Sequence, residues 1–131
     1  MYMLNTNICI YVLRKRPQRL RLKFREVSSL CISSVSYAEL CFGIESGAPA
    51  LRRERWEQLD AFTRMLLIES LDSEVGRHYG YLRSLYKEHL LSIGNNDLLI
   101  AAHARSLGAV LVTNNTLEFS RIPDLSVENW M

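Results

Sequence analysis

The sequence has few cysteines, glycines and prolines, and it lacks a long hydrophobic run. Its 131 residues include three cysteines, six glycines and three prolines. An odd cysteine count without a CxxC pair argues against a disulfide framework and a structural zinc site, so we expect Cys9, Cys31 and Cys41 to be free core residues. No stretch approaches the ~20 apolar residues of a membrane span. No basic segment precedes the apolar start MYMLNTNICIYVL, which argues against a signal peptide and predicts a cytoplasmic protein.

Several enzyme motifs are also missing. The segment after the first apolar run, LNTN, has no glycine, which excludes the dinucleotide-binding fingerprint, and the P-loop pattern is absent. The GxSxG pattern of serine hydrolases is absent as well. His78, His89 and His103 fall in predicted helices and match no motif with a cysteine, so we interpret them as structural. Carboxylates and amides are left as the side chains that could carry chemistry.

The composition is that of one folded domain, which we place over residues 1–131. Hydrophobic residues make up 48% and charged residues 23% of the chain. The formal net charge is only +2, but residues 1–25 contain seven bases and no acid, and a second basic group opens at residue 52. Such clusters indicate either contact with an anion such as RNA or a solvated helix face. The candidate RNA-binding residues are Arg14, Lys15, Arg16, Arg52 and Arg53.

Short apolar segments alternate with amphipathic ones along the whole chain. The apolar segments predict strands at 2–4, 30–33, 66–69, 109–113 and 126–130. Helices are expected at 7–13, 17–24, 35–44, 50–65, 72–86 and 97–106. Their predicted capping residues are Asn7, Ser36 paired with Glu39, Asp72, Asn96 and, at a C-terminus, Gly108. This alternation predicts an α/β fold, in which a parallel sheet of four to five strands carries helices on both faces.

Polar residues follow the predicted strands. They form the groups Asn5-Thr6-Asn7, Asn96-Asp97 and Thr113-Asn114-Asn115, and Glu39 lies shortly after the second strand. Ligands of parallel sheets bind at the carboxyl ends of the strands. Carboxylates there favour a hard divalent cation, which can activate water for phosphodiester hydrolysis. The alternative is that Glu39 and Asp97 only stabilise helix starts.

Four segments resemble those of a known family. MYMLNTNICIYVL, ISSVSYAEL, IGNNDLLIAAHARSLGAVLVTNN and RIPDLSVENW resemble the VapC toxins, the PIN-domain ribonucleases of bacterial type II toxin–antitoxin systems. The similarity covers nearly the whole chain and extends to the enteric branch, which cleaves initiator tRNA in the anticodon stem-loop. It implies a PIN-like α/β fold and RNA hydrolysis with Mg²⁺ or Mn²⁺ held by a cluster of acids.

The resemblance also implies the site residues. The four catalytic positions of the family fall on Asn5, Glu39, Asp97 and Asn115, and two hydroxyl positions that orient the acids fall on Thr6 and Thr113. Glu118 lies one helical turn beyond Asn115, where it would supply part of the missing charge as a supporting residue. Of these, Asn5, Glu39 and Asp97 would hold the metal ion. The family has aspartate where this chain has Asn5, and the change removes a charge and replaces an acceptor with a donor. We therefore expect an attenuated nuclease.

The resemblance further implies a partner. A VapB-type antitoxin would cover an apolar stripe formed by Ile10, Leu13, Leu20 and Phe24, and would present an arginine to the acids. The alternative for the stripe is ordinary core packing of amphipathic helices. A homodimer, and contact with operator DNA only through the antitoxin, are implied as well. The alternative is a catalytically inactive PIN module that binds RNA or antitoxin and regulates the operator within the complex. An aspartate codon at position 5 of the gene would favour the enzyme, and an asparagine codon the binding module.

Overall fold

A sheet of five parallel strands forms the centre of the molecule, and the computed structural model describes residues 1–87 and 93–131. The strands follow the order β3-β2-β1-β4-β5, and each neighbouring pair is parallel. Their bounds are β1 Tyr2–Leu4, β2 Leu30–Ser33, β3 Leu67–Glu69, β4 Val110–Val112 and β5 Ser126–Glu128. The predicted parallel sheet is confirmed.

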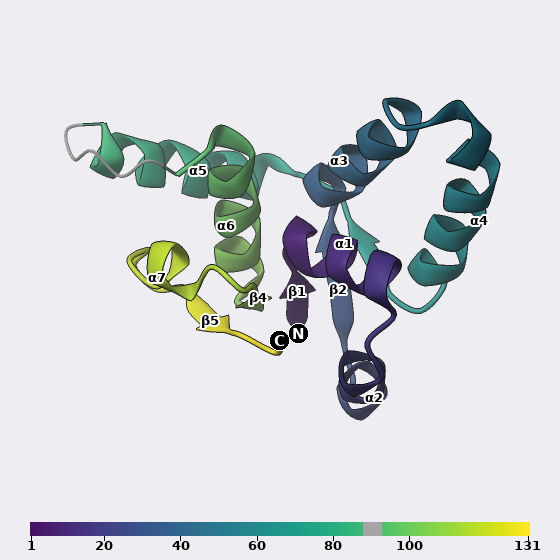
Figure 1. Ribbon diagram of the computed structural model, residues 1–131. Helices are drawn as coiled ribbons and strands as arrows, with labels where there is room; N and C mark the ends of the chain where they lie inside the picture. Colours follow the sequence, from purple (N-terminus) through teal and green to yellow (C-terminus); the bar gives the residue numbers. More distant parts are fainter. Residues whose placement is uncertain (88–92) are drawn as a thin grey trace.

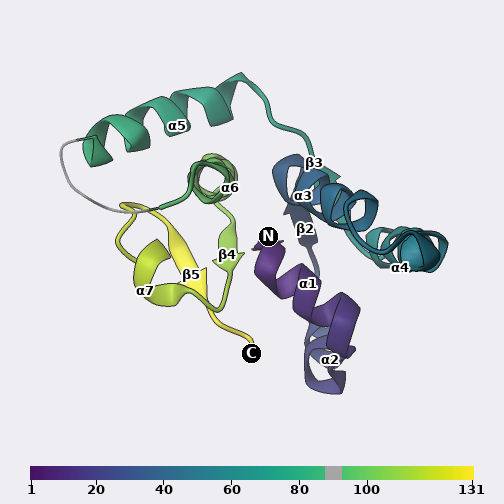
Figure 2. The ribbon, with the colours of Figure 1, turned by 45° about the horizontal axis from the view of Figure 1, so that its top comes forward.

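Helices cover both faces of the sheet. They are α1 Thr6–Lys15, α2 Gln18–Glu26, α3 Ser34–Glu45, the short 3₁₀ helix η1 Pro49–Leu51, α4 Arg52–Thr63, α5 Ser73–Tyr86, α6 Asn95–Leu107 and α7 Thr116–Phe119. Figure 2 shows α1 to α4 on one side of the strands and α5 to α7 on the other. Because successive strand residues point to opposite faces, Leu4 packs among the first group and Met3 among the second. None of the described helices is long and apolar enough to cross a membrane.

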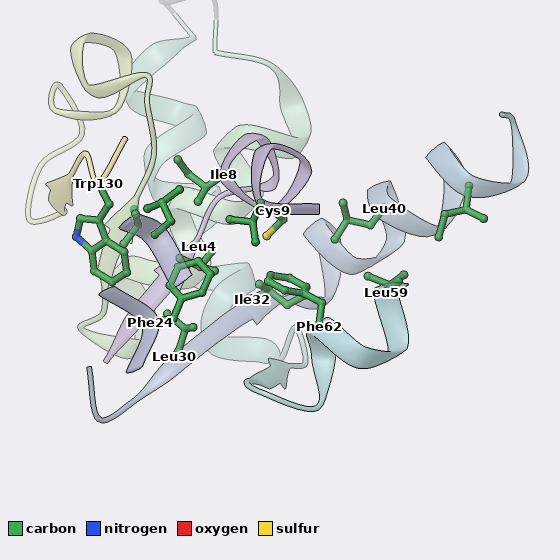
Figure 3. Close-up of a cluster of buried hydrophobic side chains, with 14 residues drawn as sticks. Leu4, Ile8, Cys9, Phe24, Leu30, Ile32, Leu40, Leu59, Phe62 and Trp130 are labelled. Carbon is green, nitrogen blue, oxygen red and sulfur yellow. The ribbon is translucent and has the colours of Figure 1, made fainter. Parts of the chain in front are cut away.

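The larger core cluster joins the two ends of the chain (Figure 3). The Trp130 ring lies 5.1 Å from the Tyr2 ring and 6.2 Å from the Phe24 ring, centroid to centroid. Leu20 is buried in the same cluster, with 1% of its surface exposed. The prediction that Leu20 and Phe24 form an exposed stripe is therefore wrong, because α2 packs this face against the C-terminal tryptophan.

Three helices begin earlier than predicted. Asn5, rather than Asn7, is the N-cap of α1, and its Oδ1 accepts the Thr6 N–H at 2.8 Å. Ser33 caps α3 by accepting the Val35 N–H at 3.1 Å. Gly94 occupies the N-cap of α6, so the last two residues of the predicted loop at 92–96 are helical, while its first residue lies outside the described part of the chain.

These shifts have a common cause. Strands β1 and β2 run directly into their helices, so the cap is the residue at the strand end and not a later loop residue. Asp72 does cap α5, and Gly108 ends α6 at a φ of 63°, as predicted.

Ser36 and Glu39, predicted as a capping box, lie inside α3. The capping role is therefore excluded for Glu39, and its carboxylate needs another explanation.

Candidate active site

The polar residues predicted at strand ends meet at one edge of the sheet. Asn5 follows β1 and Thr113 follows β4, while Glu39 lies in the second turn of α3 and Asp97 in the first turn of α6. Figure 1 shows the carboxyl ends of β1 and β2 and the start of α6 toward the same side of the molecule. Strand β1 lies between β2 and β4, so the chain crosses over in opposite directions on its two sides. This is the position at which open α/β sheets bind their ligands.

Thr6 fixes the Glu39 carboxylate. Its Oγ1 lies 2.7 Å from Glu39 Oε1 and 2.9 Å from Ser36 Oγ. A hydroxyl has one proton to donate, so Thr6 donates it to the carboxylate and accepts from the Ser36 hydroxyl. Ser36 is fully buried and supports Thr6, although its spacing from Glu39 predicts a helix cap. The one-turn spacing from Ser36 to Glu39 was the available signal, because it also places both side chains toward α1.

Asn5 is buried, with 2% of its surface exposed, and both ends of its amide are engaged. The oxygen accepts from the Thr6 N–H, and Nδ2 donates to Thr113 Oγ1 at 3.1 Å. Because Oδ1 must face the Thr6 N–H, the amide cannot turn over without placing two donors against each other. Asn5 therefore presents an N–H group to Thr113.

The contacts of Thr113 suit a carboxylate at position 5 better than an amide. Thr113 Oγ1 faces three donors, namely Asn5 Nδ2, the Asn115 N–H at 3.1 Å and Asn7 Nδ2 at 3.5 Å. A hydroxyl oxygen has two lone pairs and one proton to donate. Among the described residues the Thr113 proton has no acceptor. An aspartate at position 5 would accept it and would leave the two lone pairs to Asn115 and Asn7.

The carboxylates of the site repel one another. Burial, then the charge of Glu39 and then that of Glu118, raise the pKa of Asp97 above its ordinary value. Glu118 is held by the Asn115 amide, which donates to its Oε2. The charge of Glu118 therefore acts on Asp97 together with that of Glu39, and Asn115 holds the Glu118 carboxylate in place. A cation bound among them would relieve the repulsion, which is a common property of ligand sites.

Replacing Asp97 with asparagine should therefore stabilise the protein. A carboxyl group with a raised pKa binds its proton more tightly in the folded state, so ionised Asp97 is a penalty at neutral pH that fades on acidification toward that pKa. We expect Asp97→Asn to raise the free energy of unfolding at pH 7 by about 1 kcal/mol, and the gain to shrink as the pH falls. Urea denaturation at several pH values measures this. Asp60→Asn, at an exposed position on α4, is the control, and a loss of stability in Asp97→Asn contradicts the account.

The donor atoms fit a hard divalent cation. Glu39, Asp97 and Glu118 offer carboxylate oxygens, and Asn7 Oδ1 is buried without a hydrogen-bond partner among the described residues. Oxygen ligands of this kind suit Mg²⁺ and Mn²⁺. However, no group of three acidic, His or Cys side chains in the described ranges 1–87 and 93–131 forms a ready-made metal cluster. With an amide at position 5, Glu39, Asp97 and Glu118 do not by themselves form such a cluster.

Arg14 and Arg55 lie in the same groove as Glu39. Together with Glu39 they line a groove of about 110 Å³, whose apolar walls include Ile10 and Leu13. This part of the predicted antitoxin stripe remains accessible. The groove therefore combines an apolar floor, two cations and one carboxylate of the site.

The other predicted RNA-binding residues lie elsewhere. Arg52 forms an ion pair of 3.3 Å with Glu45, and Arg53 one of 3.6 Å with Glu57. Arg16 ends α1 in a left-handed conformation and lines a separate hollow between α1 and α4, while Lys15 is exposed. Of the five predicted RNA-binding residues, Arg14 lines the groove that contains Glu39. Arg55, which lies on α4 where this helix faces α1, lines the same groove.

The histidines of the described residues make structural contacts, as predicted. His103 is 1% exposed, and its Nδ1 lies 2.8 Å from Ser33 Oγ at the start of α3. His78 Nδ1 lies 2.8 Å from Arg105 Nη1 and accepts its proton. His89 lies outside the described residues.

His103 should contribute to stability through Ser33. In His103→Leu the Ser33 hydroxyl loses its buried partner, and we expect the free energy of unfolding to fall by about 1–3 kcal/mol. His103→Asn, which keeps a polar atom near the position of Nδ1, should lose less. Chemical denaturation of the two variants measures this, and equal losses would show that packing, not the hydrogen bond, sets the cost.

The cysteines are unsuited to nucleophilic chemistry. Burial raises the pKa of the Cys31 thiol to about 12, and it raises the pKa of Cys9 as well. Cys9 and Cys31 are buried and Cys41 is partly buried. All three are free, so the predicted absence of a disulfide framework is confirmed. A thiolate nucleophile at neutral pH is excluded for the two buried residues.

Comparison with known proteins places this geometry in a family. The PIN domain family matches residues 2–125. The chain is 41% identical over 133 residues to Ribonuclease VapC2 of Rickettsia felis, covering 98% of this chain and 97% of that protein. It is 35% identical to the tRNA(fMet)-specific endonuclease VapC of Salmonella typhimurium, covering 98% and 97%. The crystal structure of the Rickettsia felis VapBC2 complex on a promoter DNA fragment superposes with a TM-score of 0.90 at 41% identity, covering 99% of this chain and 98% of that one. The chain therefore belongs to the VapC ribonucleases of the PIN-domain family.

Proposed function

We propose that this chain is the toxin of a type II toxin–antitoxin pair, acting in the cytoplasm as a divalent-metal-dependent endoribonuclease that is attenuated by Asn5. The observation that carries the proposal is the meeting of Glu39, Asp97 and position 5 at the carboxyl edge of the sheet. One relative is a tRNA(fMet)-specific endonuclease, which supports initiator tRNA as the substrate.

Each residue of the site has a distinct task in this proposal. Glu39, Asp97 and the side chain at position 5 would hold Mg²⁺ or Mn²⁺, and a bound cation supplies activation of water and compensation of phosphate charge. Thr6 donates to Glu39 Oε1 and thereby aims the carboxylate. Thr113, directly after β4, orients the side chain at position 5. Preorganised ligands of this kind cost little rearrangement when the substrate binds.

Asn5 weakens the site in two ways. It contributes no charge, so a divalent cation would depend on Glu39 and Asp97, with Glu118 beside them. Its single oxygen already accepts from the Thr6 N–H, and its Nδ2 group faces Thr113, which leaves less ligand capacity than an aspartate would offer. The attenuation therefore follows from both charge and hydrogen bonding.

A VapB-type antitoxin would bind the groove beside the acids. Its apolar side chains would cover Ile10 and Leu13, and an arginine would reach Glu39. The Rickettsia felis relative was crystallised as a VapBC2 complex with promoter DNA, which supports both an antitoxin partner and operator contact through it. A homodimer of this chain within the complex is part of the same proposal.

A second candidate function is favoured by Asn5 itself. A PIN module without a complete acidic cluster would bind RNA or antitoxin, and would regulate the operator without cutting RNA. The codon at position 5 of the gene separates the two, because an asparagine codon favours the binding module.

Expression of the Asn5→Asp variant in a bacterial host tests the proposed function. We expect growth arrest and a single cut in the anticodon stem-loop of initiator tRNA, mapped by primer extension. The Asn5→Asp, Glu39→Gln double variant should leave growth and tRNA intact. A folded Asn5→Asp protein that neither arrests growth nor cuts tRNA contradicts the ribonuclease and favours the binding module.

A further inference from the structure

Arg83 on α5 is a cation held in place at the start of α6. Its Nη1 donates to Asn95 Oδ1 at 2.8 Å and also contacts the Tyr79 hydroxyl. Its guanidinium carbon lies 5.8 Å from the centre of the Tyr79 ring. Within the described ranges, Arg83 forms no ion pair with a carboxylate, whereas Arg77 on the same helix lies 3.9 Å from Glu74.

Arg83 and the acids lie on opposite sides of the same helix start. Asn95 is the first residue of α6 and Asp97 the third. At about 100° per residue, two residues turn just over half way round a helix. Arg83, which contacts Asn95, therefore lies across the first turn of α6 from Asp97. Lys87 lines a hollow together with Arg83 and Asn95, which adds a second base to this flank.

Cations beside an acidic site favour the binding of RNA. Carboxylates repel the phosphates of an RNA strand that passes over them. Arg14 and Arg55 provide cations beside Glu39, from α1 and α4. Arg83 and Lys87 provide them on the α5 side of Asp97. A guanidinium that is already held by hydrogen bonds loses less conformational entropy when it binds a phosphate.

We propose that Arg83, assisted by Lys87, binds a backbone phosphate of the RNA strand on the α5 side of the acids. The RNA then crosses the site from the α1–α4 flank to the α5–α6 flank. This inference rests on the proposed ribonuclease function, and it adds a contact that the clusters in residues 14–25 and 52–55 do not supply.

Equilibrium RNA binding by the chain with Asn5 tests the proposal, because this form should bind without rapid cleavage. The probe is a fluorescein-labelled anticodon stem-loop of initiator tRNA, titrated at several salt concentrations. We expect Arg83→Glu to weaken binding about 10-fold and to lower the slope of log K against log salt by about one. Arg77→Glu is the matched control, since it makes the same charge change on the same exposed helix, and its binding should change much less. Arg83→Lys, which keeps the charge, should retain most of the affinity.

The outcomes separate this inference from the proposed function. Unchanged affinity and salt slope in a folded Arg83→Glu variant overturn the inference, even if Arg14→Glu weakens binding. Equal losses in Arg83→Glu and Arg77→Glu also overturn it, because the effect is then one of net charge. Absence of RNA binding by every form, together with no cleavage by Asn5→Asp, overturns the ribonuclease proposal itself. Circular dichroism of each variant confirms that it is folded.

Discussion

Asn5→Asp is expected to increase RNA cleavage in the presence of Mg²⁺ by at least ~100-fold over the chain with Asn5, because a metal ligand and its charge are restored. The structure adds a second reason for this size of effect. The carboxylate would accept a hydrogen bond from the Thr113 hydroxyl, whose proton has no acceptor among the described residues. This hydrogen bond would orient the new metal ligand in addition to its charge. Single-turnover cleavage of initiator tRNA with enzyme in excess measures the rate constant directly.

Asn114→Asp is the matched control for this experiment. Asn114 is exposed directly after Thr113, and its Oδ1 accepts from Asn7 Nδ2, so the same charge is added to the same neighbourhood. The rate should rise much less than in Asn5→Asp, because the ligand position itself would still hold an amide. An equal rise in the two variants would show that total charge, and not a carboxylate at position 5, limits the reaction.

Leu20→Asp should unfold the protein, whereas Ile10→Asp should leave it folded and weaken antitoxin binding. Leu20 is 1% exposed in the core beside Trp130, and a buried unpaired carboxylate there costs at least ~4 kcal/mol. Ile10 is 37% exposed and lines the groove beside Glu39. A charge at the centre of an apolar contact typically costs more than 1 kcal/mol of binding energy, so the complex should weaken about 10-fold or more.

Co-expression with the small open reading frame beside the gene, followed by affinity purification and thermal denaturation, measures both effects. Leu22→Asp is the control, since Leu22 is exposed on α2 and lines a hollow near Trp130 instead of the groove. It should leave both folding and the complex intact. If Ile10→Asp is folded and still co-purifies with its antitoxin, the groove is not the binding surface.

The arrangement of strands and helices was predictable because it depends on local pattern. The three inner strands β2, β1 and β4 are short apolar runs, and most of their residues are buried, as expected for a parallel sheet. The helix starts were harder to predict, because Asn5, Thr6 and Asn7 are all competent capping residues. Only the direct passage from strand to helix selects Asn5. The same ambiguity concealed the role of Ser36, since its spacing from Glu39 also matches a capping box.

Surface properties were less predictable, because they depend on contacts between distant parts of the chain. The amphipathic pattern of α2 does not show which partner covers Phe24, and that partner includes Trp130 from the far end of the sequence. Likewise, Arg52 forms an ion pair with Glu45 at the end of α3, and the basic cluster alone does not show this pair. Glu39 and Asp97 were predictable as a pair because parallel strands bring their carboxyl ends to one edge. The sequence contains no local signal for Arg83, whose position is fixed by the packing of α5 on α6.

We propose that Glu39, Asp97 and the side chain at position 5 form one divalent-cation site. Isothermal titration calorimetry with Mn²⁺, in the absence of RNA, measures the affinity of this site. Asn5→Asp should bind at least about 10-fold more tightly than the chain with Asn5, and Glu39→Gln in the Asn5→Asp background should remove most of that gain. Equal Mn²⁺ affinity for Asn5 and Asn5→Asp, or an affinity that Glu39→Gln leaves unchanged, would contradict the account.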